Sequence, residues 1–143
     1  MTRRRNAGFT LIEIMVVVVI LGILAAVVVP NIMSKPEDAR VAAAKQDIRA
    51  IEAALNMYKL DNFYYPSTQQ GLEALVQKPG GEPAARNWRE PYIKQLPKDP
   101  WGNPYNYITP GSHGEFDLFS YGKDGKPGGE GYESDIGNWD LGG

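Results

Sequence analysis

A glycine-rich segment near the C-terminus, residues 121–139, carries four carboxylates that could bind a metal ion. Calcium takes about six to eight oxygen ligands, and flexible loops supply them from carboxylates and backbone carbonyls. Asp124 and Asp135 stand at the two ends of the glycine-rich run, so one ion held by both would close the loop. Such an ion could replace the disulfide that a chain without cysteine cannot form. A solvated acidic loop explains the composition equally well, since the EF-hand pattern is absent.

Side chains for nucleophilic catalysis or for a zinc site are scarce. The chain has one histidine, His113, in a predicted turn, and no cysteine, so no Ser/His/Asp or Cys/His set can be assembled. The pair Asp124 and Glu133 could in principle cleave a glycosidic bond, but its glycine-rich setting offers no rigid cleft. We therefore expect no enzymatic activity. A formal net charge of −2 also argues against nucleic acid as a partner.

Glu13 is the one charged residue in the apolar run of residues 9–29. At helical rise the run spans about 31 Å, which matches the hydrocarbon thickness of a bilayer and predicts a membrane-crossing helix. A carboxylate inside a membrane costs several kcal/mol unless it is paired or protonated. Cleavage after Gly8 would make Phe9 an N-terminal cation one turn from Glu13. The carboxylate could then pair within its own chain, pair with a neighbouring subunit, or extend unpaired to the interface.

The residues before the apolar run set its orientation. Arg3, Arg4 and Arg5 should stay in the cytoplasm, which places the C-terminal part on the opposite side. An ordinary secretory signal has a shorter apolar region with small residues after it. Here the small residue Gly8 comes before the run, so cleavage there would leave the hydrophobic helix on the mature chain.

Helical periodicity continues beyond the apolar run, over residues 30–62. Apolar residues recur there at three- and four-residue steps and predict an amphipathic helix packed on a sheet. They are Val41, Ala44, Ile48, Ile51, Leu55 and Tyr58. Pro30 removes one helical hydrogen bond, so we expect a kink or local melting near it.

The remaining residues, 63–143, read as a small globular part. Ser67 to Gln70 is a capping-box pattern and predicts a short helix after it. Five prolines in residues 79–100 predict an ordered loop. Alternating apolar residues predict two antiparallel strands, around residues 105–108 and 116–120. The predicted fold is therefore α+β, with a long N-terminal helix, half transmembrane and half amphipathic, packed on a small C-terminal antiparallel sheet.

The segment Gly8-Phe9-Thr10-Leu11-Ile12-Glu13, followed by an apolar run, resembles the class III signal of type IV pilins and pseudopilins. The resemblance implies that a prepilin peptidase cleaves between Gly8 and Phe9 and that Phe9 is then N-methylated. It also implies that Glu13 neutralises the Phe9 amine of an adjacent subunit during filament assembly. Residues 1–8 would be a basic leader peptide, and residues 9–29 would form the filament core.

Three further segments, residues 66–72, 96–105 and 135–139, are similar to those of the major pseudopilins of type II secretion systems. This resemblance implies a pilin-like fold and a structural, non-enzymatic subunit of a periplasmic pseudopilus that drives folded proteins through the outer membrane. The alternative is a type IV pilin for adhesion, motility or DNA uptake. The absence of cysteine and the segment 135–139 favour the secretion subunit.

The same resemblance implies particular partners and a location. The chain would form a helical homo-oligomer and contact minor pseudopilins, an inner-membrane assembly platform, prepilin peptidase and an outer-membrane secretin. It would be a single-pass protein of the bacterial inner membrane, with residues 63–143 in the periplasm, and would enter the periplasmic pseudopilus on assembly.

The pseudopilin resemblance also implies a structural calcium in residues 121–139. Asp124 and Asp135 match the side-chain ligands of that family. The carbonyls of Tyr121 and Lys126, with one or more between residues 128 and 134, would complete the set. Some members carry an aspartate where this chain has Ser134, so the ligand set is expected to differ there. The side chains that could substitute are Glu130 and Glu133.

Overall fold

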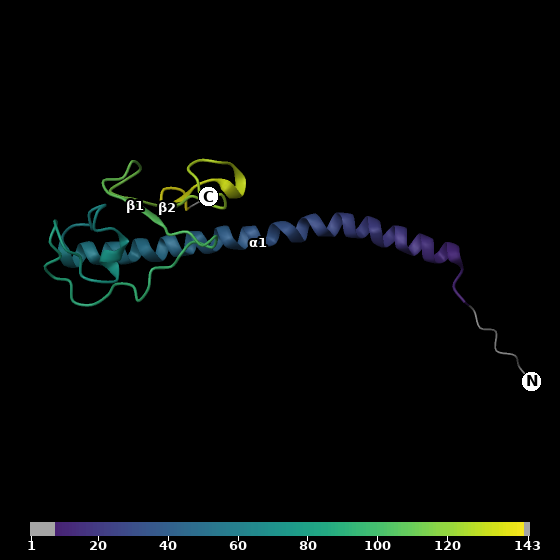
Figure 1. The fold of residues 1–143 in the computed structure, drawn as a ribbon, viewed down its shortest axis with the longest axis horizontal. Coiled ribbons are helices and arrows are strands. Elements are labelled where there is room, and N and C mark those ends of the chain that lie inside the picture. The colour runs from purple at the N-terminus through teal and green to yellow at the C-terminus, as the bar shows by residue number, and fades with distance from the viewer. Residues whose placement is uncertain (1–7, 142–143) are drawn as a thin grey trace, which may run out of the picture. The chain divides into compact units, whose positions relative to one another are not determined.

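The structure, a computed structural model, describes residues 8–141 apart from the side chains of residues 28–34. The elements in chain order are α1 (Leu11–Asn62), η1 (Leu72–Leu75), β1 (Asn106–Ile108), β2 (Asp117–Ser120), η2 (Gly131–Glu133) and β3 (Ile136–Gly137) (Figure 1). The chain divides into two compact units, Met1–Glu37 and Asp38–Gly143. The second unit therefore contains the amphipathic half of α1 together with the sheet.

The first unit contains the apolar start of α1. The large apolar side chains between Leu11 and Val27 are all half-exposed or more, from 50% at Ile20 to 76% at Leu11. These residues bury no core within their own unit. The helix α1 runs without a break through Pro30, so the local melting predicted there is wrong for this structure, while the Pro30 side chain lies outside the described set.

In the second unit, α1 buries one face. Ala44, Ile48, Ile51 and Leu55 are fully buried, and Tyr58 is 1% exposed. Their spacing of four, three, four and three residues keeps them on one side of a helix with 3.6 residues per turn. The amphipathic stripe predicted from the sequence is thus confirmed.

The sheet has three antiparallel strands in the order β1-β2-β3. Asn106 pairs with Phe119 and Ile108 with Asp117, while Phe119 also pairs with Gly137 on the other side. The two predicted strands and their hairpin are confirmed, with slightly later starts. The third strand, β3, was not predicted, because two residues are too few for a period-two pattern.

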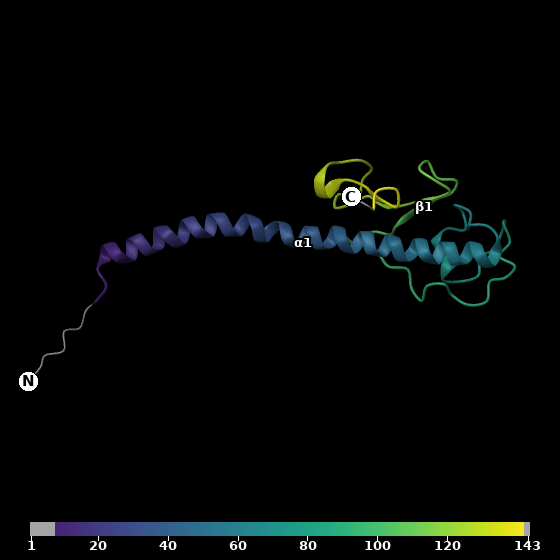
Figure 2. The same cartoon turned by 180° about the vertical axis from the view of Figure 1, so that it is seen from behind.

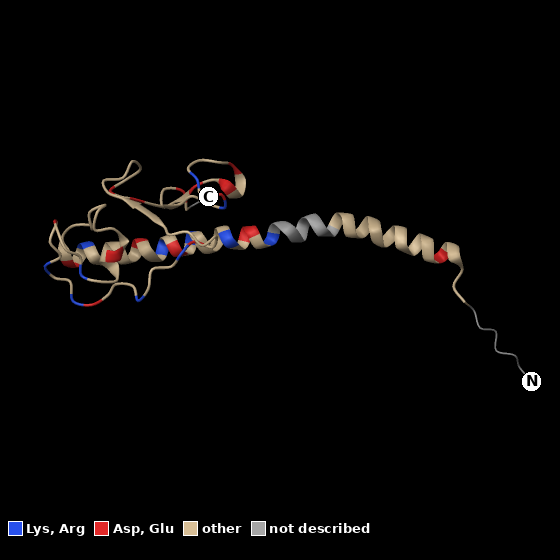
Figure 3. Ribbon diagram, in the orientation of Figure 1, with Lys and Arg blue, Asp and Glu red and all other residues tan. Residues whose placement is uncertain are grey.

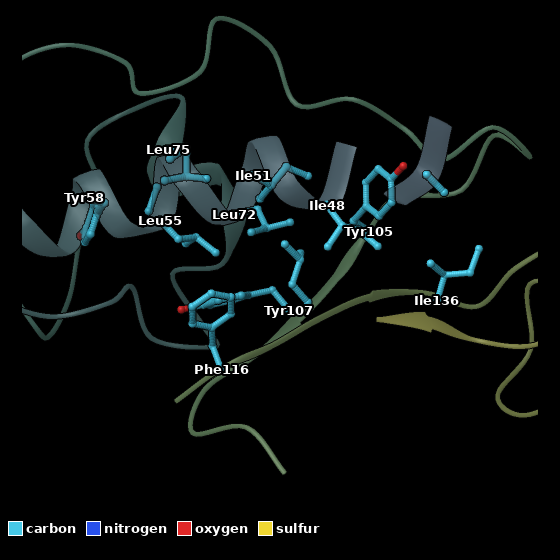
Figure 4. Packing of buried hydrophobic residues seen from close by; sticks show 14 of the residues in the cluster. Ile48, Ile51, Leu55, Tyr58, Leu72, Leu75, Tyr105, Tyr107, Phe116 and Ile136 are labelled. Atoms are coloured by element: carbon cyan, nitrogen blue, oxygen red, sulfur yellow. The ribbon is translucent and has the colours of Figure 1, made fainter. Parts of the chain in front are cut away.

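The core lies between the helix and the sheet. Side chains from α1, η1 and the strands point toward one another there (Figure 4). Seen from both sides, the sheet and the loop that connects β2 to β3 lie along one flank of the C-terminal part of α1, and residues 79–100 run along the opposite flank (Figure 1 and Figure 2). The glycine-rich loop is therefore attached to a packed two-layer support.

The predicted capping box forms, but it does not start an α-helix. Ser67 N–H donates to Gln70 Oε1 (2.9 Å), and Gln70 N–H donates to Ser67 Oγ (3.1 Å). The helix that follows is the single 3₁₀ turn η1, which begins after Gly71 at φ +64°. The backbone turns sharply at Gly71, so the box closes a turn instead of starting a longer helix.

Candidate functional site

The first candidate site is the start of α1, where Thr10 caps the helix. The Glu13 N–H donates to Thr10 Oγ1 at 3.3 Å, which satisfies one of the free N–H groups of the first turn. Threonine at the cap with glutamate three residues later is a capping-box pair, and an acidic side chain in the first turn complements the helix dipole. This local role of Glu13 was not predicted from the sequence, although the Thr-x-x-Glu pattern signals it.

Gly8 and Phe9 precede the helix, and both are exposed. A Cβ added at Gly8 would meet no atom within 4 Å, and Gly8 does not have the positive φ that favours glycine. The fold therefore gives no steric or conformational reason for glycine at position 8. If position 8 requires a glycine, the requirement comes from something outside the chain.

The predicted membrane span is only partly covered by the structure. Among the residues that the structure describes, no helix is both long enough and apolar enough to cross a membrane. The predicted span of residues 9–29 includes residues 28 and 29, whose side chains lie outside the described set. Charged residues are sparse on the N-terminal part of α1 and frequent on the second unit (Figure 3).

The second candidate site is the connection between β2 and β3, which folds back on itself. Lys123 N–H donates to the Tyr132 carbonyl at 2.9 Å. At Gly122 (φ +78°) an added Cβ would lie 2.5 Å from the Ser134 carbonyl oxygen, and at Gly129 it would lie 2.5 Å from the Glu133 carbonyl oxygen. Because glycine has no Cβ, the first part of this connection can approach the carbonyl oxygens of Glu133 and Ser134 in its last part.

The two aspartates predicted as calcium ligands each hold a backbone N–H of this loop. Asp124 Oδ1 accepts the Lys126 N–H at 3.1 Å, and the Asp135 carboxylate accepts the Gly128 N–H at 3.1 and 3.2 Å. An ionised carboxylate has about four lone-pair positions, so both keep capacity for a cation. The structure thus assigns both side chains a role in shaping the loop.

The donor set of the loop fits a hard cation. Within the described part of the chain, no three His, Cys, Asp or Glu side chains gather closely enough to hold a metal ion. An ion here would therefore need backbone carbonyls beside the aspartates, an all-oxygen set of the kind that suits calcium. The Ser134 hydroxyl donates its hydrogen to the Gly131 carbonyl at 2.7 Å. The backbone carbonyl oxygen of Ser134 is therefore a better metal ligand than its hydroxyl.

All five predicted ligand residues lie in this one connection. The Tyr121 ring packs edge-on against Phe119, with centroids 5.2 Å apart, which fixes the start of the loop on β2. Lys126 is exposed, and Ser134 and Asp135 are half-buried. The fifth residue is Asp124, which is also exposed.

Two hydrogen bonds that were not predicted from the sequence hold the C-terminal region on α1. Tyr132 Oη donates to Asp38 Oδ1 at 2.8 Å, and Arg49 Nη2 donates to the Leu141 carbonyl at 2.7 Å. The partners in each pair are about ninety residues apart in sequence. No local pattern signals such contacts, because only the fold brings the partners together.

A buried carboxylate holds the hairpin between β1 and β2. Asp117, 5% exposed, accepts the N–H groups of Ser112 (2.9 Å) and His113 (3.1 Å), and its Oδ2 lies 3.1 Å from His113 Nδ1. Burial acts to raise the pKa of Asp117, but His113 and the two N–H groups outweigh it and hold that pKa below its usual range. The His113 ring stacks on Trp139 with centroids 3.9 Å apart. His113 therefore serves the structure of the hairpin.

Comparison with known proteins covers nearly the whole chain. Residues 31–139 match the family described as type II secretion system (T2SS), protein G, and residues 3–29 match the prokaryotic N-terminal methylation motif. The type II secretion system core protein G of Pseudomonas aeruginosa is 67% identical over 141 residues, which cover 98% of this chain and 99% of the relative. The core protein G of Vibrio cholerae is 60% identical over 139 residues, with 96% and 94% covered.

A solved structure agrees with these relatives. The crystal structure of the major pseudopilin from the type 2 secretion system of enterohaemorrhagic Escherichia coli matches with a TM-score of 0.69 at 47% identity, covering 77% of this chain and 95% of that one. The predicted pilin-like α+β fold is thereby confirmed. The chain belongs to the type II secretion system protein G family.

Proposed function

We propose that this chain is the repeating structural subunit of a type II secretion pseudopilus. Growth of the pseudopilus drives folded proteins through the outer membrane. The match of residues 31–139 to the protein G family carries this proposal. The methylation motif alone would suit a surface pilin for adhesion, motility or DNA uptake equally well. Relatives named core protein G at 53–67% identity favour secretion over that alternative.

The apolar start of α1 supports a role in assembly. Its exposed side chains would be costly in water at roughly 25 cal/mol per Å² of apolar surface, so they need a bilayer or other subunits around them. The second unit offers a further exposed stripe on α1, with heptad-like spacing of four and three residues that suits close packing of helices. The stripe consists of Ala39, Ala43, Gln46, Ala50, Ala53, Met57 and Leu60.

Before assembly, residues 9–29 span the inner membrane once. Arg3, Arg4 and Arg5 hold the N-terminus in the cytoplasm, and the second unit lies in the periplasm. The sparsity of charge on the N-terminal part of α1 supports this arrangement.

A prepilin peptidase cleaves between Gly8 and Phe9, and the new N-terminus is methylated. The match of residues 3–29 to the methylation motif supports this step. The open space around Gly8 supports it as well, because the fold does not require glycine there. The requirement for glycine at position 8 would then come from the peptidase that binds the leader.

Glu13 has two roles in this proposal. Its backbone N–H binds the Thr10 cap and helps to start the helix. Its carboxylate neutralises the Phe9 amine of an adjacent subunit, which favours insertion of a new subunit in register, because an unpaired charge in an apolar core is costly.

Calcium closes the loop between β2 and β3. Asp124 and Asp135 supply side-chain oxygens, and the carbonyls of Tyr121, Lys126 and Ser134 supply the others. The approach of the Ser134 carbonyl to Gly122 and the spare lone pairs of both aspartates support this set. The ion supplies a positive charge that links the two ends of the loop, where the chain has no disulfide.

The function is structural and not enzymatic. The partners are minor pseudopilins, an inner-membrane assembly platform, prepilin peptidase and the outer-membrane secretin. Membership of a pseudopilin family supports the assembly with a secretion system.

Deletion and complementation in the native host test this function. We expect loss of exoproteins from the culture medium, with accumulation in the periplasm, and recovery on expression of the wild-type chain. Twitching and adhesion should be unchanged. Normal secretion with lost twitching or adhesion would instead assign the chain to a surface pilus.

A further inference from the structure

A buried aspartate outside the glycine-rich loop contacts the start of that loop. Asp99, in the proline-rich loop of residues 79–100, is only 4% exposed. Its Oδ1 accepts the N–H groups of Trp101 (3.1 Å) and Asn103 (2.8 Å), and its Oδ2 accepts the hydroxyl of Ser120 at 2.7 Å. Burial of a carboxylate is costly unless it is hydrogen-bonded, so these bonds must be kept in the folded state.

Ser120 connects Asp99 to the loop by two hydrogen bonds, and we call the chain Asp99–Ser120–Gly122 the relay. Ser120 is fully buried at the end of β2, and its Oγ accepts the N–H of Gly122 at 3.1 Å. A hydroxyl has a single hydrogen. Since Asp99 takes that hydrogen, the lone pairs of Oγ are turned toward the Gly122 N–H. The backbone on both sides of Tyr121 is therefore fixed by a carboxylate that lies outside the loop.

A second contact runs from Asp99 through Asn103. Besides the bond to the Asp99 side chain, Asn103 accepts the Asp99 N–H on its carbonyl at 2.8 Å, so its backbone is held on two sides. A Cβ added at Gly125 would lie 3.2 Å from Asn103 Nδ2. The Asn103 amide therefore lies against the loop one residue beyond Asp124, and Asp99 supports the loop at two points that bracket this ligand.

We propose that Asp99 is a positioning residue that pre-forms the first half of the cation loop. The inference rests on the calcium site proposed above. A glycine-rich segment loses much conformational freedom on ordering, and binding is tighter when the protein orders the ligands beforehand. Asp99 and Ser120 order residues 120–125 before the ion arrives. The calcium affinity of the loop thus depends on a residue that does not ligate the ion.

Two substitutions interrupt the relay at different atoms. Asp99→Asn keeps the size of the side chain but replaces one acceptor oxygen by an amide group. Ser120→Ala leaves the carboxylate and removes the hydroxyl. A hydrogen bond to a charged group contributes enough for about a tenfold change in an equilibrium constant, so we expect each variant to weaken the calcium Kd about tenfold. Because both act through one relay, the double variant should bind no more weakly than the weaker single variant.

Asp117→Asn is the matched control. Asp117 is buried to the same extent and also accepts two backbone N–H groups, but its partners lie in the hairpin at Ser112 and His113. It should lower the melting temperature while leaving the calcium Kd within about twofold of the wild type, because sites with no shared partner act independently.

Calorimetric titration of the full-length chain in detergent with Ca²⁺ tests the relay. Weakened binding in Asp99→Asn and Ser120→Ala, with the wild-type Kd kept in Asp117→Asn, supports it. An unchanged Kd in both relay variants overturns it, and equal weakening in Asp117→Asn overturns it as an effect of general destabilisation. If Asp99→Asn does not fold, Ser120→Ala decides alone. A wild-type chain that binds no calcium overturns the site itself, and the role of Asp99 with it.

Discussion

The two halves of helix α1 satisfy their apolar side chains in opposite ways. Leu55 and its neighbours on the buried stripe contact the sheet of their own unit and lose all exposure to solvent. Val17, in the first unit, stays 53% exposed, like the apolar residues around it. Composition separates the halves as well, since charged residues are frequent on one and nearly absent from the other (Figure 3).

The two halves of α1 therefore obtain their stability from different sources. The second half is stabilised by tertiary contacts of its own chain, as most protein helices are. In the first half, the described large apolar side chains from Leu11 to Val27 stay half-exposed or more, so their surface is available for a bilayer or for other copies of the chain. Changes in the two halves should therefore disturb different properties, namely folding of the second unit and assembly of the filament.

Replacement of Glu13 should have the largest effect. Glu13→Gln keeps a side chain that suits a capping box but removes the charge that we pair with Phe9 of an adjacent subunit. We expect normal precursor processing and nearly complete loss of filaments and secretion. Sheared-filament yield and exoprotein levels measure this. Wild-type filaments from Glu13→Gln would rule out the charge pair and leave the capping role as the function of Glu13.

Matched truncations in the two halves should separate folding from assembly. Leu55→Ala removes a fully buried side chain and should lower the free energy of unfolding by about 2–5 kcal/mol. Val17→Ala should leave that free energy unchanged and reduce filament yield. Tryptophan fluorescence reports on the second unit alone, because Trp88, Trp101 and Trp139 all lie there. A large loss of stability in Val17→Ala would show that the halves are not independent.

Removal of calcium should affect only the second unit. At a calcium concentration one hundred times Kd, binding should add roughly 2.7 kcal/mol to its stability. Asp124→Ala should lose this increment, and a chelator should remove it from the wild type. Asp140→Ala is the control, since Asp140 is an exposed aspartate beyond the loop. A melting curve of the wild type that is the same with calcium and with chelator would show that no calcium ion stabilises this unit.

Acid should weaken the second unit through Asp117, with the smallest effect. Its folded-state pKa lies below the usual value, so its contribution is fully present above about pH 4 and is lost as pH falls through the lowered pKa. The stability difference between wild type and Asp117→Asn should therefore shrink on acidification below pH 4. The comparison at several pH values by denaturant unfolding measures it. A difference that stays constant down to about pH 2 would contradict a lowered pKa.

The sequence predicts those parts of the fold that rest on local patterns. The stripe from Ala44 to Tyr58 and the hairpin of β1 and β2 follow from helical and alternating periodicity, and the structure has both. The Ser67–Gln70 box also forms, but the length of the helix after it depends on Gly71, whose positive φ the capping pattern does not encode. Local rules thus predict the contacts of the box better than the element that follows.

Contacts between distant residues could not be predicted in this way. Asp99 lies in a proline-rich loop and reads as a turn residue, while its bond to Ser120 requires β2 to lie beside that loop. The same holds for Tyr132 and Asp38. The loop 121–139 was predicted from composition and resemblance, but the residues that support it become visible only in the folded chain.

The intact mass of the mature chain shows whether the apolar helix is retained with its N-terminus exposed for assembly. Mass spectrometry of the protein from membranes of its native host should give the mass of residues 9–143 plus one methyl group on Phe9. Gly8→Leu should give the uncleaved chain, with the tryptophan-reported melting of the second unit unchanged. A wild-type mass that corresponds to a chain starting at Met1, or to one starting beyond residue 29, would contradict cleavage after Gly8 with retention of the apolar helix.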